Sequence, residues 1–172
     1  MLRALIFIVT AMCISQISMA GIVESKLAKC DSVNKAEGYL QYGYCVVDAN
    51  TDILNQTVAA ESRLIRLFKA CSVKFAPIKG AAPLAKWCQS GIASRHGIIP
   101  SLQESIAFQP KTRRNFEDPK TSLASQQQIV KDQIVAIKSN ARYFNASVGQ
   151  LNVSEKTLKS QYKAATGKAL TF

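Results

Sequence analysis

The clearest pattern of hydrophobic and polar positions lies between Leu123 and Tyr162, where apolar residues recur at alternating steps of four and three. This heptad spacing predicts a long C-terminal helix with one narrow apolar seam. Gly149 and the cap-like residues 152–155 allow a break near residue 150, which would give a helix pair instead. We expect the seam to pack on the rest of the chain, with a coiled-coil dimer as the alternative. Its positions are Leu123, Gln127, Val130, Ile134, Ile137, Ala141, Phe144, Val148, Leu151, Glu155, Leu158 and Tyr162.

Shorter stretches before residue 109 have helical periodicity too. Residues 22–49 read as helical, and their three closely spaced tyrosines suit core or hairpin packing. A second helix is expected from a cap at Asn50 or Thr51 to about Phe75, with one apolar stripe.

A turn at residues 77–83 separates these helices from a third, which Pro83 suits as a first helical residue. A short helix is expected over residues 100–108. Residues 109–120 hold two prolines and four basic residues, which predicts an exposed loop. We interpret its basic residues as a plain basic loop, with a processing site or an anion contact as the alternatives.

Residues 1–20 have the order of a secretory signal peptide. Arg3 is followed by an apolar run from Ala4 to Ile14, and small residues occupy the last and third-last positions of Ser18-Met19-Ala20. The run is shorter than the roughly 20 residues that a spanning helix needs. We therefore expect cleavage after Ala20 and a mature chain without a membrane span. The protein would be extracellular in a eukaryote and periplasmic in a bacterium.

Four cysteines remain in the mature chain, Cys30, Cys45, Cys71 and Cys88, and an even number in an exported protein predicts two disulfides. Helices flanking the turn at residues 77–83 would place Cys71 level with Cys88. Cys30–Cys45 follows by elimination and requires a bend at one of two intervening glycines, 38 or 43. The pairing Cys30–Cys71 with Cys45–Cys88 remains open.

The composition, 48% hydrophobic and 19% charged, is that of a globular domain. The formal net charge is +11, and most of the excess lies after residue 88. Outside the cytoplasm, such a charge favours anionic surfaces or acidic proteins as partners, although a merely solvated surface is the simpler interpretation.

Few residues suit catalysis. His96 is the only histidine, the four cysteines are assigned to disulfides, and the adjacent acids Glu117 and Asp118 lie in the expected loop. There is no phosphate-binding glycine motif and no nucleophile elbow. We therefore expect a non-enzyme with no metal and no cofactor.

Three N-x-[ST] sequons begin at Asn55, Asn145 and Asn152. Asn145 and Asn152 are seven residues apart, which places them on one flank of the predicted C-terminal helix, where we expect both to face solvent. In a eukaryotic source these asparagines would be glycosylation sites.

Residues 148–168 are similar to the helix-turn-helix of AraC-type transcription regulators. The resemblance rests on the turn Leu151-Asn-Val-Ser154, on Leu158 and Tyr162, and on the ending Thr166-Gly-Lys168. It implies that Ser154 caps a recognition helix whose residues 155–161 face DNA. The family also has a second such motif and a cytoplasmic address, which this chain lacks, so nucleic acid is not the expected partner.

These observations predict an all-α, disulfide-stapled helical bundle with a long C-terminal helix or broken helix pair. We expect residues 21–108 to form the disulfide-stapled region and residues 121–172 to pack on it as one domain, as a monomer unless the seam dimerises. The expected function is secreted, non-catalytic binding of an unknown protein, small ligand or anionic surface. The alternatives are an inhibitor or immunity-type protein that blocks an enzyme or toxin, and a small secreted hydrolase.

Overall fold

The computed structural model describes residues 17–171, and this part of the chain is all-helical. The predicted signal peptide lies outside the described residues except for Ile17–Ala20, which begin the first of the described helices. The helices are α2 (Ile17–Glu37), α3 (Tyr39–Phe75), α4 (Ala82–Ala93), α5 (Ile98–Glu117) and α6 (Leu123–Thr166).

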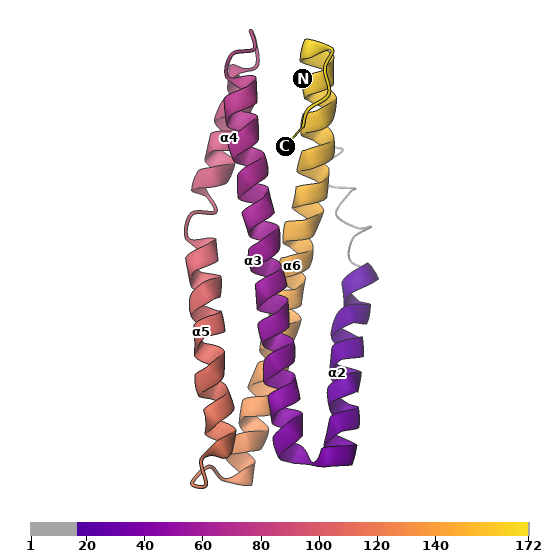
Figure 1. The fold of residues 1–172 in the computed structure, drawn as a ribbon, viewed down its shortest axis with the longest axis vertical. Helices are drawn as coiled ribbons and strands as arrows, with labels where there is room; N and C mark the ends of the chain where they lie inside the picture. The colour runs from indigo at the N-terminus through magenta and orange to yellow at the C-terminus, as the bar shows by residue number, and fades with distance from the viewer. Residues whose placement is uncertain (1–16, 172) are drawn as a thin grey trace.

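Two long parallel helices, α3 and α6, form the spine of an elongated bundle (Figure 1). Helices α4 and α5 follow one another along one side of α3, and α2 lies on the other side. As Figure 1 shows, α2 and α5 accompany the spine over one half of its length, and α4 accompanies it over the other half. Within residues 17–171, α2, α3, α5 and α6 therefore lie together in one half, and α3, α4 and α6 in the other.

Helix α3 runs without interruption through the position where we predicted a new helix to begin. Asn50 is buried and donates from Nδ2 to Oε1 of Gln133 on α6 at 2.7 Å. The Thr51 hydroxyl donates to the Val47 carbonyl one turn earlier, at 2.9 Å. Both side chains have partners inside the bundle, so the predicted cap at Asn50 or Thr51 is wrong.

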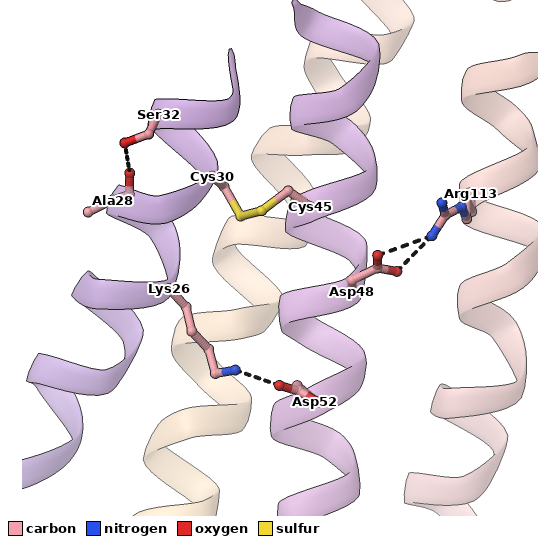
Figure 2. The surroundings of a disulfide bond; sticks show 8 residues. All are labelled: Lys26, Ala28, Cys30, Ser32, Cys45, Asp48, Asp52 and Arg113. Carbon is pink, nitrogen blue, oxygen red and sulfur yellow. Dashed lines mark hydrogen bonds and ion pairs between the residues drawn. A yellow bond between two sulfur atoms is a disulfide. The ribbon is translucent and has the colours of Figure 1, made fainter. Parts of the chain in front are cut away.

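The bend between α2 and α3 occurs at Gly38, whose φ of 90° is a left-handed conformation that suits glycine. It brings Cys30 and Cys45 into a disulfide with Cα atoms 5.4 Å apart (Figure 2). Cys71 and Cys88 are bridged across the α3–α4 turn, with Cα atoms 6.0 Å apart. Both predicted disulfides are confirmed, and the alternative pairing is wrong.

The loop predicted at residues 109–120 is also wrong, because α5 continues through Pro110 to Glu117 and the connection to α6 is only residues 118–122. The same helix absorbs the predicted short helix at residues 100–108. Gln109, Thr112 and Phe116 recur at three- and four-residue steps and are buried. Polar residues therefore contribute most of the buried stripe, which is why hydrophobicity alone did not reveal it.

Helix α6 confirms the predicted long helix and is unbroken over 44 residues. The Ser122 side chain accepts from the Ser125 N–H at its start, and Gly167 ends it in a left-handed conformation. Residues 148–168 therefore contain no helix-turn-helix before Gly167. Ser154, which the resemblance made a cap, is buried within the helix.

The seam of α6 packs within the chain from Val130 to Tyr162, whereas Leu123 and Gln127 are exposed. Leu151 is buried as expected, but Phe144 is only half-buried. The core has two apolar clusters, one around Val46 and Ile137 and one around Phe68 and Leu158. Buried polar residues of α3 and α6 lie between the two clusters: Thr57, Glu61 and Ser147.

Candidate functional site

A buried ionic cluster joins α3, α6 and the α4–α5 turn at the middle of the bundle. The side chain of Glu61 on α3 is 0% exposed. Its Oε1 accepts from the Ser147 hydroxyl at 2.6 Å and from the Tyr143 hydroxyl at 3.2 Å. Its Oε2 lies 3.0 Å from Nε of Arg95, an ion pair that is not aligned as a hydrogen bond. The carboxylate is thus enclosed by groups from three elements.

Arg95 connects this cluster to the apolar core next to α4. Its guanidinium lies 5.5 Å from the centre of the Phe68 ring and donates to Oε1 of Gln150 on α6. Burial raises the pKa of Tyr143, and the nearby carboxylate of Glu61 raises it further. Because Glu61 has no exposed surface, we assign the cluster a positioning role: it fixes the register of three elements.

An open groove of about 650 Å³ lies between α3, α5 and α6. Its wall combines amides with apolar groups, including Phe108, which is 54% exposed. Asn50 lines the groove, where it donates to Gln133 and accepts from Asn140 at 2.9 Å. Gln109 also lines the groove, and its buried Oε1 has no hydrogen-bond partner among the described residues. The groove therefore offers hydrogen-bonding groups beside an aromatic ring.

The net charge of the described chain lies in one half of the bundle. We define the basic half as residues 61–95 and 142–171, where α3, α4 and α6 run together (Figure 1). It contains twelve Lys and Arg against two Asp and Glu, a formal side-chain charge of +10. The neutral half, residues 17–60 and 96–141, contains nine of each, a net charge of zero.

Pairing differs between the halves as well. In the neutral half, cations meet acids on neighbouring helices: Lys26 lies 2.5 Å from Asp52, and Arg113 lies 2.9 Å from Asp48 (Figure 2). In the basic half, both acids are already engaged, Glu61 with Arg95 and Glu155 with Lys159 at 2.5 Å. The positive charge there is therefore not balanced by acids of the same half.

Most of the cations of the basic half are on its surface. Arg142, Lys156 and Lys163 lie at multiples of seven residues along α6, hence on nearly one face of the helix. Trp87 is 47% exposed at the end of this half, beside an open hollow of about 530 Å³ at the α3–α4 turn. The exposed cations are Arg63, Arg66, Lys69, Lys79, Lys86, Arg142, Lys156, Lys159, Lys163 and Lys168.

The other predicted site residues are dispersed. Asn55 and Asn152 are exposed, as glycans require, whereas Asn145 is half-buried. His96 is exposed in the turn between α4 and α5. Among the tyrosines of residues 39–45, Tyr39 and Tyr42 stack edge to face, and Tyr44 donates to Glu117. These rings are half-buried and pack against the core near the bend between α2 and α3, in line with the predicted core and hairpin packing.

The basic residues of the expected loop belong to α5. Arg113 pairs with Asp48, and its guanidinium lies 4.3 Å from the centre of the Tyr44 ring. Lys111 and Arg114 are exposed. Arg113 is therefore engaged within the fold, and these residues form no separate charged loop.

Sequence reasoning missed the basic half because it is assembled from two separate segments. The sequence placed most of the excess charge after residue 88, whereas residues 61–95, which include the end of α3 and all of α4, contribute seven of the twelve cations. The heptad spacing of Arg142, Lys156 and Lys163 was an available signal. Only the parallel packing of α3 against α6 brings the two segments together.

Within residues 17–171, no three His, Cys, Asp or Glu side chains are grouped closely enough to hold a metal ion. No helix of the same range is long and apolar enough to cross a membrane. Comparison of the chain with models of protein families, with curated proteins and with solved structures found no match.

Proposed function

We propose that this chain is an exported, non-catalytic binding protein that holds an anionic partner on its basic half. The observation that carries the proposal is the segregation of charge: twelve cations against two acids in one half, and nine of each in the other. If the charges were only solvated, we would expect them to be spread over both halves of the bundle.

Two features support an oxidising compartment outside the cytoplasm. Residues 1–20 have the order of a secretory signal peptide, and Cys30–Cys45 and Cys71–Cys88 form disulfides. The expected location is therefore the extracellular space or the periplasm.

Binding on the basic half needs no enclosed cavity. Clustered cations raise the local concentration of anions and accelerate encounter with an anionic partner, and salt weakens both effects. The rigid backbone of α3 and α6 holds the cations at fixed separations, so the partner meets a preformed surface. Because the neutral half is balanced by its own acids, it should contribute little to binding.

Retention on heparin, used as a generic polyanion, tests the proposal with two matched triple variants. One reverses Arg66, Lys156 and Lys163 to Glu in the basic half. The other reverses Lys29, Lys111 and Lys120 to Glu in the neutral half, which gives the same net charge. All six side chains are exposed, so we expect both variants to fold.

We expect the basic-half variant to elute at much lower salt than wild type, and the neutral-half variant to elute close to wild type. Equal weakening of both variants would mean that only net charge matters, which would contradict the proposal. A native partner captured one to one by the basic half and identified as a secreted enzyme would make the chain an inhibitor.

A further inference from the structure

The end of the basic half combines apolar surface with positive charge. The turn between α3 and α4 exposes Pro77, Gly80 and Pro83, and Trp87 follows on α4. The hollow of about 530 Å³ at this end is lined mainly by apolar side chains, including Ile78, Leu84 and Ala165 of α6. Apolar surface that is exposed next to cations is unusual for a surface that only contacts water.

Four lysines lie at the same end of the bundle as this apolar turn. Lys79 lies in the turn and Lys86 on α4 next to Trp87. Lys163 is in the last turn of α6 and Lys168 follows its end, and this end of α6 meets the α3–α4 turn (Figure 1). The Phe75 and Tyr162 rings join α3 to α6 there, with centres 5.5 Å apart. The lysines are exposed and so are positioned to meet phosphate groups.

From this arrangement we infer that the α3–α4 end of the bundle docks on a lipid bilayer that contains anionic phospholipids. Trp87 and the apolar turn would lie at the interfacial level, where tryptophan is favoured, and the lysines would contact the headgroups. The inference rests on the proposed function and names the anionic partner of the basic half.

The apolar surface favours a bilayer over a soluble polyanion. A soluble polyanion satisfies the charges of Lys79 and Lys86 but leaves Trp87 in water. A bilayer satisfies both, because acyl chains lie directly beneath the charged headgroups. Long lysine side chains reach the headgroup level while their aliphatic stems remain against apolar surface.

Trp87 is the only tryptophan of the chain, so its fluorescence reports this contact directly. The exported protein is mixed with vesicles of phosphatidylcholine alone or with an equal share of phosphatidylglycerol. We expect a blue shift of the emission only with phosphatidylglycerol, quenching by brominated acyl chains, and reversal by added salt. These three measurements use the unmodified protein and need no variant.

A variant pair tests the lysines. Changing Lys79 and Lys86 to Gln should lower the partition coefficient about 25-fold, at about five-fold for each lysine near the surface. Changing Lys111 and Lys120 of the neutral half to Gln should leave it unchanged. Both pairs are exposed and remove the same charge.

Several outcomes would overturn the inference: equal binding to both vesicles, binding without a Trp87 shift, or equal losses in the two variants. Vesicle binding through any other part of the chain falls among these, because it leaves the Trp87 emission unchanged. If the basic half retains the protein on heparin but the protein does not bind vesicles, the bilayer inference is overturned, whereas the proposed function is still supported. If the basic half neither retains the protein on heparin nor binds vesicles, both the bilayer inference and the proposed function are overturned.

Discussion

The Nε atom of Arg95 lies 3.0 Å from a carboxylate oxygen of Glu61, at the level where the neutral half of the bundle meets the basic half. Glu61 is fully buried and Arg95 nearly so, with exposed side-chain fractions of 0% and 11%. A charge enclosed this far from water needs a partner, because its desolvation costs several kcal/mol. Each residue of the pair therefore needs the other to compensate its buried charge.

Arg95→Ala should lower the free energy of unfolding by about 3–5 kcal/mol, because it leaves the Glu61 carboxylate buried without its countercharge. Urea unfolding followed by helical circular dichroism measures the change. The double variant Glu61→Leu with Arg95→Met should recover part of the loss, since it removes both charges. An Arg95→Ala effect below about 0.5 kcal/mol, as for an ordinary surface change, would show that the pair contributes nothing.

Gly43→Ala should destabilise the protein, although alanine normally favours a helix over glycine by about 1 kcal/mol. A Cβ at position 43 would lie 2.5 Å from the buried Phe116 ring, and forcing the ring away should cost about 1–3 kcal/mol. Gly97 is the control, because its Cβ would meet nothing within 4 Å. In thermal melts, Gly43→Ala should lower the melting temperature, and Gly97→Ala should raise it or leave it unchanged. A higher melting temperature for Gly43→Ala would contradict the packing described.

Mild reduction should open Cys30–Cys45 before Cys71–Cys88. Cys45 is half-buried, whereas Cys71 and Cys88 are fully buried, and thiol exchange requires access to sulfur. Alkylation at increasing reductant concentration followed by peptide mapping gives the order. Each bridge closes a short loop and should contribute about 3 kcal/mol to stability. Simultaneous opening of both bridges would mean that global unfolding, not local access, controls reduction.

Stability should fall at alkaline pH, in part through Tyr143. Burial and the Glu61 charge raise the pKa of Tyr143 above the ordinary tyrosine value of 10.0. The folded state then holds the phenol proton more tightly than the unfolded chain does, so this contribution is complete below about pH 10 and is lost as pH rises through the folded pKa. Tyr143→Phe should show a smaller alkaline loss than wild type in urea unfolding. An identical pH dependence would contradict this.

The fold was largely predictable where the spacing of apolar residues is regular. The four-and-three spacing of α6 predicted a long helix, and the turn at residues 77–83 predicted Cys71–Cys88. The second half of helix α5, residues 109–117, was missed because its buried stripe includes Gln109 and Thr112, which hydrophobicity does not mark. The predicted cap at Asn50 failed because its side chain bonds to α6, a tertiary partner that local sequence does not reveal.

The candidate site was less predictable than the fold. The excess of Lys and Arg was evident, but its confinement to one half depends on the parallel packing of α3 with α6. The pairing of Glu61 with Arg95 was equally hard to predict, since the two residues are distant in sequence. Surface chemistry of this kind becomes visible only when segments far apart in the chain are placed side by side.

Lysine acetylation with and without a bound heparin fragment tests most directly whether the basic half holds an anionic partner. Mass spectrometry of tryptic peptides then reports the reactivity of each exposed lysine. The account predicts that Lys86, Lys156 and Lys163 are protected by the polyanion, while Lys29 and Lys111 react at unchanged rates. Equal protection of both groups, or protection confined to Lys29 and Lys111, would contradict it.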